Sequence, residues 1–377
     1  MRILLTGDPA SGFIRDYASN LRKYGPAGIR IDLFSTMTPG AFVARPFFDR
    51  VFCYPHLGIY KHFKQSRFVV RLIWLFFFIL RNGRKYDHIH IHYLLIDFAF
   101  LSPLFSLLGY RPVITVFGSD LLRISPSRKK ALTGIIRHAR LLTFANQEIR
   151  DRVCSYYRID PSKTRICRFG LPPLDHIRDL DVQPPDALRY QLGLPEGKTV
   201  ICVGSNFNSN QQHVKIMKSL AENEPLAGMT ERLHFVFPLT YGTETGYKQT
   251  LLKLLDNFPF SRTVLTEFLS DADNAALRRT CDIMVQLQEY DQLSGAMQEH
   301  LYAGNVVITG KWLPYLTFKE RGVYFIEIDD VGQVGQAVHH AVVNLAAEKE
   351  KCRNNPRAIY DLSSWEANIH SWISLYR

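Results

Sequence analysis

The sequence lacks the cysteine and histidine spacings of metal-binding domains. Its six cysteines are scattered and form no Cys-x-x-Cys pair. This pattern is typical of free thiols in a reducing compartment, and it excludes a zinc ribbon or a disulfide-stapled secreted domain. His88, His90 and His92 alternate on one face of a predicted strand, but they span too much length to share one ion easily. We expect them to be packing residues, with His92 nearest the functional edge of the sheet.

A long apolar run is also missing. The segment Phe68–Leu80 is almost wholly apolar, but it has 13 residues with Arg71 inside, too short to cross a bilayer. The basic residues that flank it are Lys61, Lys64, Arg67, Arg81, Arg84 and Lys85. Such a segment suits a helix lying on a membrane surface, and nearly as well a helix buried against a sheet. The N-terminal apolar stretch is too short for a signal peptide, so we expect a buried first strand there.

Charge is unevenly distributed along the chain. Residues 1–180 carry 28 Lys and Arg against 12 Asp and Glu, a net charge of +16. The remaining 197 residues carry 18 against 23, a net charge of −5. The basic half therefore favours an anionic partner, such as a membrane surface or a pyrophosphate-linked lipid. No aromatic–basic interleaving or known nucleic-acid motif accompanies this charge, so we expect no nucleic-acid partner.

Short β-rich runs alternate with helical stretches in both halves. The expected strands are Arg2–Thr6, Ile29–Phe34, Asp87–His92, Pro112–Phe117, Leu141–Phe144, Thr164–Cys167, Thr199–Val203, His234–Pro238, Thr263–Leu265, Ile283–Leu287, Val306–Ile308 and Val323–Ile326. The expected helices include Phe13–Tyr24, Ala296–Ala303, Val331–Glu348 and Ser363–Tyr376. This alternation predicts an α/β protein with two doubly wound, Rossmann-like domains.

Paired prolines near residues 172 and 184 bracket a predicted linker between the two domains. We expect an N-terminal domain at 1–180 and a C-terminal domain at 181–362, with the last helix, 363–377, packing back on the first. Parallel sheets bind ligands at the carboxyl ends of their strands, so a ligand is expected in a central cleft between the two domains.

The segment from Ile283 to Ile308 is the most informative part of the sequence. It predicts a strand, a polar loop, a short helix and another strand. Ser294 is a plausible N-cap and Gly295 opens the helix, whose N-terminus suits a diphosphate because it presents free N–H groups. Asp291 lies in the loop before this helix and Glu299 lies one turn into it, where carboxylates can accept hydrogen bonds from sugar or ribose hydroxyls.

This segment resembles the donor-binding stretch of the large bacterial family of retaining GT-B glycosyltransferases. Asp291 and Glu299 have that family's eight-residue spacing of two acids, and Ala303–Ile308 fits its Ala-Gly-x-Pro-Val-Ile close. The N-terminal half adds matches at Asp87–Tyr93, Thr115–Asp120, Ala145–Val153 and Arg168–Pro172. The resemblance implies that the first acid lies near the donor sugar and the second binds the ribose. Phe117 replaces the family's usual histidine before Gly118.

The loop after the first predicted strand of the second half resembles that of a second group of glycosyltransferases. The family's usual Arg and Lys are absent after Gly204 and Ser205, and the chain instead carries an Asn-x-x-His segment ending at His213 and a Pro-Leu-x-Tyr-Gly segment at Tyr241. These resemble transferases that add N-acetylfucosamine to a lipid-linked acceptor. Backbone N–H groups would then neutralise the diphosphate, with Lys311, Arg123 or His213 as helpers.

Together the resemblances imply a GT-B hexosyltransferase acting on a nucleotide diphosphate-sugar. The acceptor would be a polyprenyl-pyrophosphate-linked glycan of a bacterial surface polysaccharide, bound on the basic domain at the cytoplasmic face of the plasma membrane. No Asp-x-Asp-like motif is placed to hold a metal, so we predict metal-independent transfer without a cofactor. Retention and inversion both stay open; the catalytic candidates are Asp291 and, as bases for inversion, Asp8 and Asp120.

Three other functions fit parts of the sequence. A sugar-nucleotide epimerase shares the fold, but it would need no acceptor and leaves the basic domain and the apolar run without a role. A non-catalytic protein that binds membranes or nucleic acids would use the basic half, but it leaves the ordered motifs of the second half unexplained. An inactive transferase is compatible with the missing Arg, Lys and His.

Overall fold

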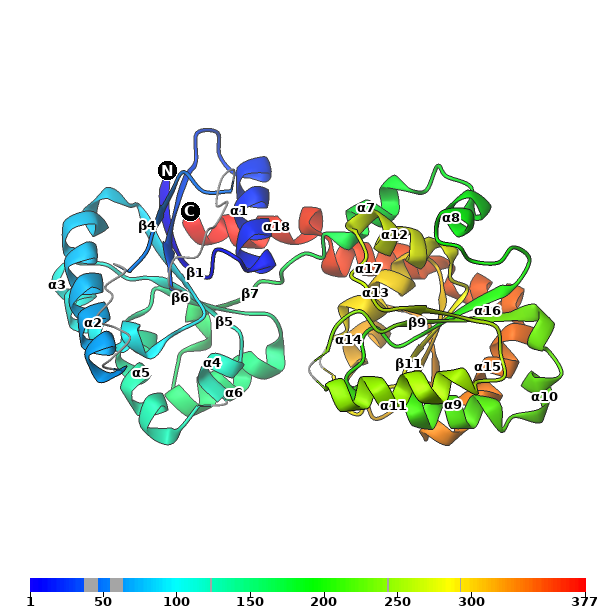
Figure 1. The fold of residues 1–377 in the computed structure, drawn as a ribbon. Coiled ribbons are helices and arrows are strands. Elements are labelled where there is room, and N and C mark those ends of the chain that lie inside the picture. Colours follow the sequence, from blue (N-terminus) through cyan, green and yellow to red (C-terminus); the bar gives the residue numbers. More distant parts are fainter. Residues whose placement is uncertain (37–46, 55–63, 123, 243, 292) are drawn as a thin grey trace. The chain divides into compact units, whose positions relative to one another are not determined.

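A computed structural model describes residues 1–36, 47–54, 64–122, 124–242, 244–291 and 293–377. The chain divides into two compact units, residues 1–170 with 365–377, and residues 171–364. Each unit is a parallel sheet with helices on both faces (Figure 1). This confirms the predicted α/β class with two doubly wound, Rossmann-like domains.

The sheet of the first unit has the strand order β3-β2-β1-β4-β5-β6-β7. Its strands are β1 Arg2–Gly7, β2 Arg30–Ser35, β3 Arg50–Phe52, β4 His88–His92, β5 Val113–Val116, β6 Leu141–Phe144 and β7 Thr164–Ile166. All neighbours pair in parallel, so their carboxyl ends meet at one edge. The sequence did not predict β3, because this short edge strand is mostly exposed and has no apolar run.

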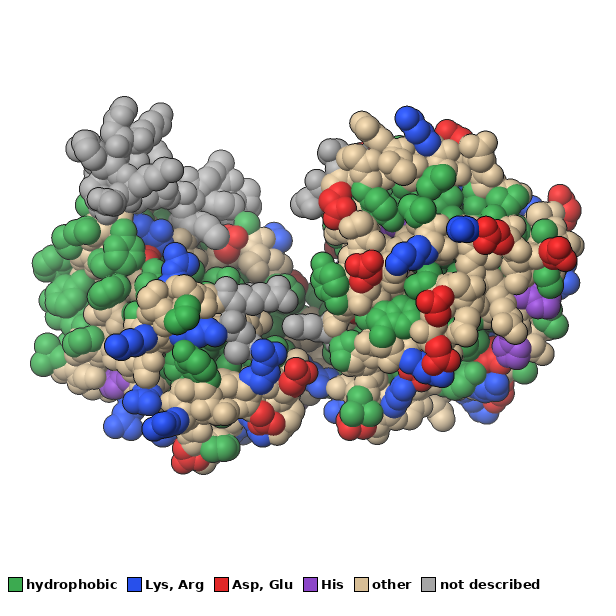
Figure 2. All heavy atoms as spheres, turned by 90° about the horizontal axis from the view of Figure 1, so that it is seen from below, with side chains coloured by type: hydrophobic (Ala, Val, Ile, Leu, Met, Phe, Trp, Pro, Cys, Tyr) green, Lys and Arg blue, Asp and Glu red, His purple; other side chains and the backbone are tan. Residues whose placement is uncertain are grey.

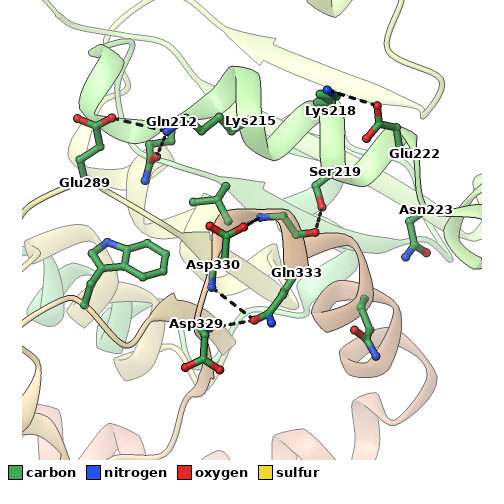
Figure 3. A pocket seen from close by; sticks show the side chains of 14 residues that line it. Gln212, Lys215, Lys218, Ser219, Glu222, Asn223, Glu289, Asp329, Asp330 and Gln333 are labelled. Carbon is green, nitrogen blue, oxygen red and sulfur yellow. Dashed lines mark hydrogen bonds and ion pairs between the residues drawn. The ribbon is translucent and has the colours of Figure 1, made fainter.

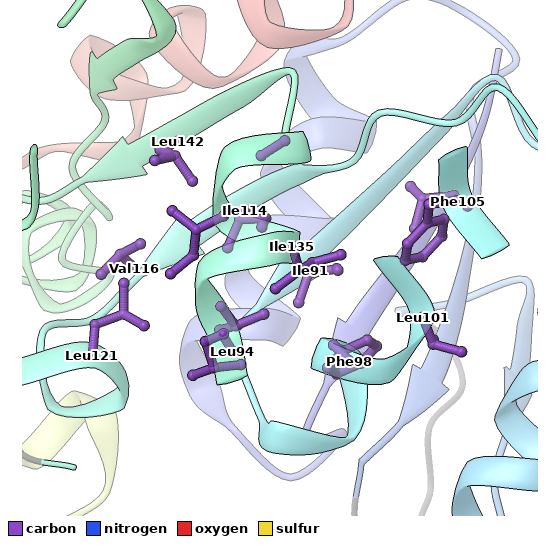
Figure 4. Close-up of a cluster of buried hydrophobic side chains, with 14 of the residues drawn as sticks. Ile91, Leu94, Phe98, Leu101, Phe105, Ile114, Val116, Leu121, Ile135 and Leu142 are labelled. Carbon is purple, nitrogen blue, oxygen red and sulfur yellow. The ribbon is translucent and has the colours of Figure 1, made fainter. Parts of the chain in front are cut away.

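Helices cover both faces of this sheet. They are α1 Gly12–Tyr24, α2 Lys64–Asn82, α3 Ser102–Leu107, α4 Ser119–Leu122, α5 Pro126–His138, α6 Gln147–Tyr157 and α18 Trp365–Ile373, with the 3-10 helix η3 Ile96–Leu101. On one face α2, η3, α3, α5 and α6 enclose a hydrophobic core. Figure 4 shows part of this core, where Ile91 and Ile114 of the sheet meet Ile135 of α5. On the other face lie α1 and α18.

The last residues of the chain complete the first unit. Trp372 of α18 is fully buried, with its ring 4.9 Å from that of Tyr17 and 4.8 Å from that of Phe169. The Tyr376 hydroxyl lies 2.7 Å from the Tyr17 hydroxyl and 2.6 Å from His90 Nδ1. The C-terminal helix therefore packs on the first unit, although it follows the whole of the second.

The histidines of β4 are packing residues. His90 and His92 are fully buried, and His90 Nε2 lies 2.7 Å from the Thr115 hydroxyl. Burial lowers the pKa of His92 to about 3, so its imidazole is neutral. Within the described part of the chain, no cluster of His, Cys, Asp and Glu side chains is arranged to hold a metal ion.

The sheet of the second unit has the order β10-β9-β8-β11-β12-β13. Its strands are β8 Thr199–Val203, β9 Leu233–Pro238, β10 Arg262–Leu265, β11 Ile283–Gln286, β12 Val306–Gly310 and β13 Ile326–Ile328. Its helices are α7 Pro173–Asp179, α8 Pro185–Gln191, α9 His213–Ala221, α10 Glu224–Ala227, α11 Thr245–Asp256, α12 Asp271–Thr280, α13 Gly295–Tyr302, α14 Leu316–Lys319, η7 Val331–Gln333, α15 Val334–Val343, α16 Leu345–Lys351 and α17 Asn355–Ser363. Helices α9, α11 and α15 cover one face; α7, α13 and α17 pack on the other.

Most element ends lie within one or two residues of the sequence predictions, and three differences are larger or change the organisation of the chain. Residues 171–180 belong to the second unit, because α7 packs on α12 and α13. Strand β13 begins at Ile326 rather than Val323, because the Asn355 side chain binds both the N–H and the carbonyl of Tyr324. The helix expected over 331–348 is interrupted at Asn344, whose amide side chain and N–H both donate to the His340 carbonyl.

Helix α2 has two apolar faces. Leu75, Phe78 and Ile79 are buried against the sheet. Arg71, the charge within the apolar run, points inward and pairs with Asp97 at 2.6 Å. The exposed stripe on the opposite side consists of Val69, Ile73, Phe76, Phe77 and Leu80.

Among the described helices, none combines the length and apolar character needed to span a bilayer.

We predict that Trp372→Ala destabilises the first unit by about 3–5 kcal/mol, because it removes a fully buried indole that packs on Tyr17 and Phe169. Urea unfolding followed by tryptophan fluorescence measures the change. Ser371→Ala, an exposed position on the same helix, is the matched control and should change the free energy of unfolding by less than about 0.5 kcal/mol. Equal effects of the two variants would show that the C-terminal helix is not part of the folded first unit.

Candidate functional site

The N-terminus of α13 lies at the carboxyl edge of the second sheet, after β11. Ser294 caps the helix as predicted, because its hydroxyl accepts a hydrogen bond from the Met297 N–H at 3.2 Å. Gly295 is the first helical residue. A helix start of this kind presents unpaired N–H groups and a partial positive charge, which together attract an anion such as a phosphate.

Asp291, in the loop before α13, is held by a tyrosine that the sequence did not point to. The Tyr315 hydroxyl donates a hydrogen bond of 2.6 Å to Asp291 Oδ2. Tyr315 is buried, and its pKa is raised by burial and by the neighbouring Asp291 carboxylate, so the hydroxyl stays protonated. The carboxylate is thereby fixed in direction. No local pattern around Tyr315 predicts this contact, since it joins residues 24 positions apart.

Glu299 is held from behind by a buried cation. Its Oε2 accepts a hydrogen bond from Arg278 Nε at 2.9 Å and a longer one from Asn274 at 3.4 Å. Its Oε1 lies on the side of Gly295, because a Cβ built on Gly295 would be 4.0 Å from this oxygen. One carboxylate oxygen is therefore paired with the Arg278 guanidinium of α12, while the other lies beside the N-terminus of α13. Sequence reasoning missed Arg278 and Asn274, because they lie on α12, outside the segment that carries the two acids.

The loop after β8 is closely packed around Gly204. This residue has φ +67°, and a Cβ there would lie 2.8 Å from His213 Nε2, so both conformation and space require glycine. Ser205 accepts a hydrogen bond from the Gln211 side chain at 3.2 Å. His213, which the sequence suggested as a helper to the diphosphate, is fully buried as the first residue of α9. Burial lowers its pKa to about 3, so it brings no positive charge to a diphosphate.

Tyr241 follows β9 and stacks on Phe268, which follows β10. The two ring centroids are 5.7 Å apart with an interplanar angle of 14°. Both side chains are exposed, Tyr241 by 46% and Phe268 by 77%. An exposed pair of stacked rings at the carboxyl edge of a sheet offers a flat apolar surface to another ring.

Lys311 follows β12 and pairs with Asp329 at 2.8 Å. Beside this pair is a pocket of about 910 Å³ between α9 and η7 (Figure 3). Both of its lysines are already paired with carboxylates of the pocket, Lys215 with Glu289 and Lys218 with Glu222. None of Asp291, Ser294 and Glu299 lines this pocket. Arg123, the other cation expected to assist, lies outside the described residues.

In the first unit, Asp120 ties two loops together at the carboxyl edge of the sheet. Its Oδ1 accepts a hydrogen bond from the Phe117 N–H and its Oδ2 one from the Leu94 N–H, both at 3.1 Å. Burial raises the pKa of this carboxyl to about 6. Gly118 beside it has φ +90°. Asp8 lies at the same edge, in the half-buried loop after β1, where its Oδ1 accepts a hydrogen bond from the Ala10 N–H at 2.9 Å.

The raised pKa of Asp120 predicts a measurable pH dependence of stability. The folded state binds this proton more tightly than the unfolded chain, whose Asp pKa is about 3.9. Stability from this group is therefore fully present below about pH 4 and is lost as the pH rises to about 6, by at most about 3 kcal/mol. In urea unfolding, the free energy of wild type minus that of Asp120→Asn should fall across this range and then level off. A constant or rising difference would contradict the assignment.

Residues 12–172 match the model of Glycosyltransferase Family 4. A comparison with curated proteins found no significant match. Among solved structures, a glycosyltransferase from Rickettsia africae is similar with a TM-score of 0.73 at 13% identity, covering 100% of this chain and 97% of that one. Anabaena HepE in complex with UDP has a TM-score of 0.69 at 14% identity, covering 100% and 99%. Sucrose-phosphate synthase from Thermosynechococcus elongatus has a TM-score of 0.67 at 15% identity, covering 100% and 98%.

The structural similarity to these proteins establishes the fold of the chain, and identities this low establish no more than the fold. The family match covers most of the first unit. The chain therefore has the GT-B fold, and the part of it that matches the model of Glycosyltransferase Family 4 lies mostly in the first unit.

Proposed function

We propose that this protein is a glycosyltransferase that moves a hexosyl group from a nucleotide diphosphate-sugar to a glycan acceptor. The observation that carries the proposal is the pair of carboxylates, Asp291 and Glu299, beside the N-terminus of α13. Each is held by its own partner, Tyr315 or Arg278. Two fixed acceptors flanking an anion-binding helix start match a ligand that carries hydroxyl groups on both sides of a diphosphate.

The donor would be bound in three parts. The diphosphate would lie against the first N–H groups of α13, where Gly295 allows close approach. Glu299 Oε1 would accept a hydrogen bond from a ribose hydroxyl, and Asp291 would contact the donor sugar. The base would stack on the exposed pair formed by Tyr241 and Phe268. The HepE structures with UDP and UDP-glucose support this class of donor.

Catalysis would depend on positioning and on stabilising the leaving group. As the bond between the sugar and the diphosphate breaks, negative charge grows on the leaving phosphate oxygen, and the α13 N–H groups are already oriented toward it. Inversion would also need a base in the first unit to take the proton of the acceptor hydroxyl. Asp8 and Asp120 are the candidates, and the pKa of about 6 for Asp120 suits a base near neutral pH.

The acceptor would be a polyprenyl-pyrophosphate-linked glycan, met by the first unit at the cytoplasmic face of the membrane. The support is the exposed apolar stripe of α2 (Val69, Ile73, Phe76, Phe77 and Leu80). Figure 2 shows hydrophobic side chains gathered at the end of the first unit where Figure 1 places α2 and α3, with Lys and Arg side chains beside them. A role in surface polysaccharide synthesis and the likeness to N-acetylfucosaminyltransferases stay predictions.

The described basic residues at this surface are Arg81, Arg84 and Lys85, all exposed. Lys61 and the side chains of Lys64 and Arg67, which the sequence places at the other end of the run, lie outside the described residues. A helix with a broad apolar face and basic residues at its end inserts its apolar side chains at the boundary between headgroups and acyl chains, while the cations contact anionic lipids.

The donor site is tested by calorimetric titration of UDP, GDP and dTDP, with EDTA present. We expect one nucleotide to bind wild type and to bind Glu299→Gln about 10- to 100-fold more weakly, because one hydrogen bond to a charged group is lost. Asp291→Asn should keep nucleotide binding, since Asp291 faces the sugar, but should lower the transfer rate. Glu348→Gln, which alters a buried carboxylate held by Tyr324 elsewhere in the second unit, is the matched control.

Failure of all three nucleotides to bind the folded wild-type protein would overturn the donor site. Binding that appears only when Mg²⁺ or Mn²⁺ replaces EDTA would overturn the predicted metal independence while keeping the site.

The membrane surface is tested by sedimentation with vesicles. We expect wild type to sediment with vesicles containing phosphatidylglycerol more than with pure phosphatidylcholine, and this binding should weaken at high salt because exposed charges are screened. Ile73→Ser/Phe77→Ser should release the protein, since both side chains belong to the exposed stripe. Val182→Ser/Leu316→Ser, at two exposed apolar positions of the second unit, is the control. Equal binding of the two double variants would contradict the proposed surface.

A further inference from the structure

Four aromatic side chains from distant parts of the sequence meet at the carboxyl edge of the first sheet. Phe13 stands in the first turn of α1, Tyr93 follows β4, Phe117 follows β5 and Phe169 follows β7. The ring centroids of Phe13 lie 5.3 Å from Phe169 and 6.2 Å from Phe117, and Phe117 stacks on Phe169 at 5.6 Å. Tyr93 adds a contact of 6.0 Å to Phe117. These four residues form one continuous aromatic cluster.

The cluster is exposed on one side and firmly supported on the other. Phe13 is 54% exposed and Tyr93 is 43% exposed. Beneath them, Phe169 contacts the buried Trp372 at 4.8 Å. Exposed aromatic rings lose the free energy that burial would give them, and a rigid support reduces the entropy lost when a ligand binds. The arrangement is therefore suited to receive another molecule.

The backbone at Tyr93 costs conformational energy that packing alone does not explain. Its φ is +62°, in the left-handed region where a non-glycine residue is strained. The strain is held in place because the Tyr93 N–H donates to the Thr115 carbonyl at 3.3 Å and the next N–H, that of Leu94, donates to Asp120 at 3.1 Å. Glycine would adopt this conformation without strain. A tyrosine at position 93 therefore lowers the stability of the fold relative to glycine through its backbone conformation.

Asp120 links the two loops that carry Tyr93 and Phe117. One carboxylate oxygen binds the N–H beside Tyr93 in the chain, and the other binds the N–H of Phe117 itself. Through these bonds Asp120 fixes the separation of the two rings. In this respect it is a positioning residue for the aromatic cluster.

We propose that the aromatic cluster is the platform on which a pyranose ring of the acceptor glycan stacks. The proposal rests on the proposed transferase function. Aromatic ring faces carry negative charge, and the axial C–H groups of a sugar carry partial positive charge, so the two surfaces attract each other. The equatorial hydroxyls need polar partners at the rim. Asp8 at the same edge offers one, because its Oδ2 has no partner among the residues that the structure describes.

A purely apolar occupant fits this edge less well than a sugar. A prenyl chain or an apolar peptide would cover the Asp8 carboxylate without giving it a hydrogen bond, which is costly. A sugar that stacks on the aromatic faces also carries hydroxyl groups that can donate to the carboxylate. The exposed stripe of α2, which consists of apolar side chains without such a carboxylate, is the surface that suits a lipid.

Saturation-transfer NMR on the full chain tests the platform, with the methyl glycosides of glucose, galactose, N-acetylglucosamine and rhamnose as probes. We expect transfer to the ring C–H protons of at least one glycoside, reduced at least fivefold in Phe13→Ala/Tyr93→Gly. Tyr93→Gly alone should unfold at no lower temperature than wild type, because glycine relieves the positive φ. Tyr190→Ala, which removes an 84% exposed ring from the second unit, is the matched control and should leave transfer unchanged.

Titration of UDP, GDP and dTDP into the same samples separates this proposal from the proposed function. Lost glycoside contact with unchanged affinity for the nucleotide that binds would support the platform. No transfer to any glycoside by wild type, or equal transfer in the double variant, would overturn the platform and leave the donor site standing. Failure of wild type to bind UDP, GDP or dTDP would overturn the donor site, and the glycoside signals would still decide the platform.

Discussion

Parallel pairing of the strands decides where the candidate sites of this protein lie. In a parallel sheet every strand points the same way, so the loops that follow the strands all emerge at one edge. In the second unit this edge gathers Gly204, Tyr241, Asp291 and the start of α13 from segments spread over about a hundred residues. In the first unit it gathers Asp8, Tyr93 and Asp120. Each site is thus a consequence of topology, and loop residues supply its chemistry.

The acidic residues at these edges share one physical arrangement. Each has a fixed hydrogen-bond donor: the Tyr315 hydroxyl for Asp291, the Arg278 guanidinium for Glu299, and two backbone N–H groups for Asp120. A donor that is already in place fixes the direction of the carboxylate and removes part of the entropy cost of binding. For Glu299 one oxygen is held by Arg278 while the other lies beside the start of α13. Both oxygens of Asp120 accept hydrogen bonds from backbone N–H groups. Its role in positioning the two loops therefore follows more directly from the structure than a role as a base.

Helix α2 presents one apolar face to the sheet and another to solvent. The sequence left burial and membrane contact as nearly equal alternatives for Phe68–Leu80. The structure shows one face of this 19-residue helix buried against the sheet and an apolar stripe exposed on the opposite face, while membrane contact by that stripe stays a proposal. The inward Arg71 explains why a charge interrupts the apolar run, since it pairs with the buried Asp97. Its charge therefore does not contribute to the exposed surface.

The sequence by itself determined the fold class, most strands and the local shape of the segment that we propose binds the donor. Apolar runs of strand length, the Ser294 cap and the spacing of Asp291 from Glu299 are local properties, and local patterns are what a sequence displays directly. Only the tertiary structure decided the rest. Tyr315, Arg278 and Phe268 contact partners that lie far away in the chain. The burial of His213 follows from its packing on Gly204. Strand β13 begins at Ile326 because the Asn355 side chain accepts the hydrogen bond of the Tyr324 N–H. Such pairings arise when the sheets and helices assemble, so no periodicity or motif in the sequence records them.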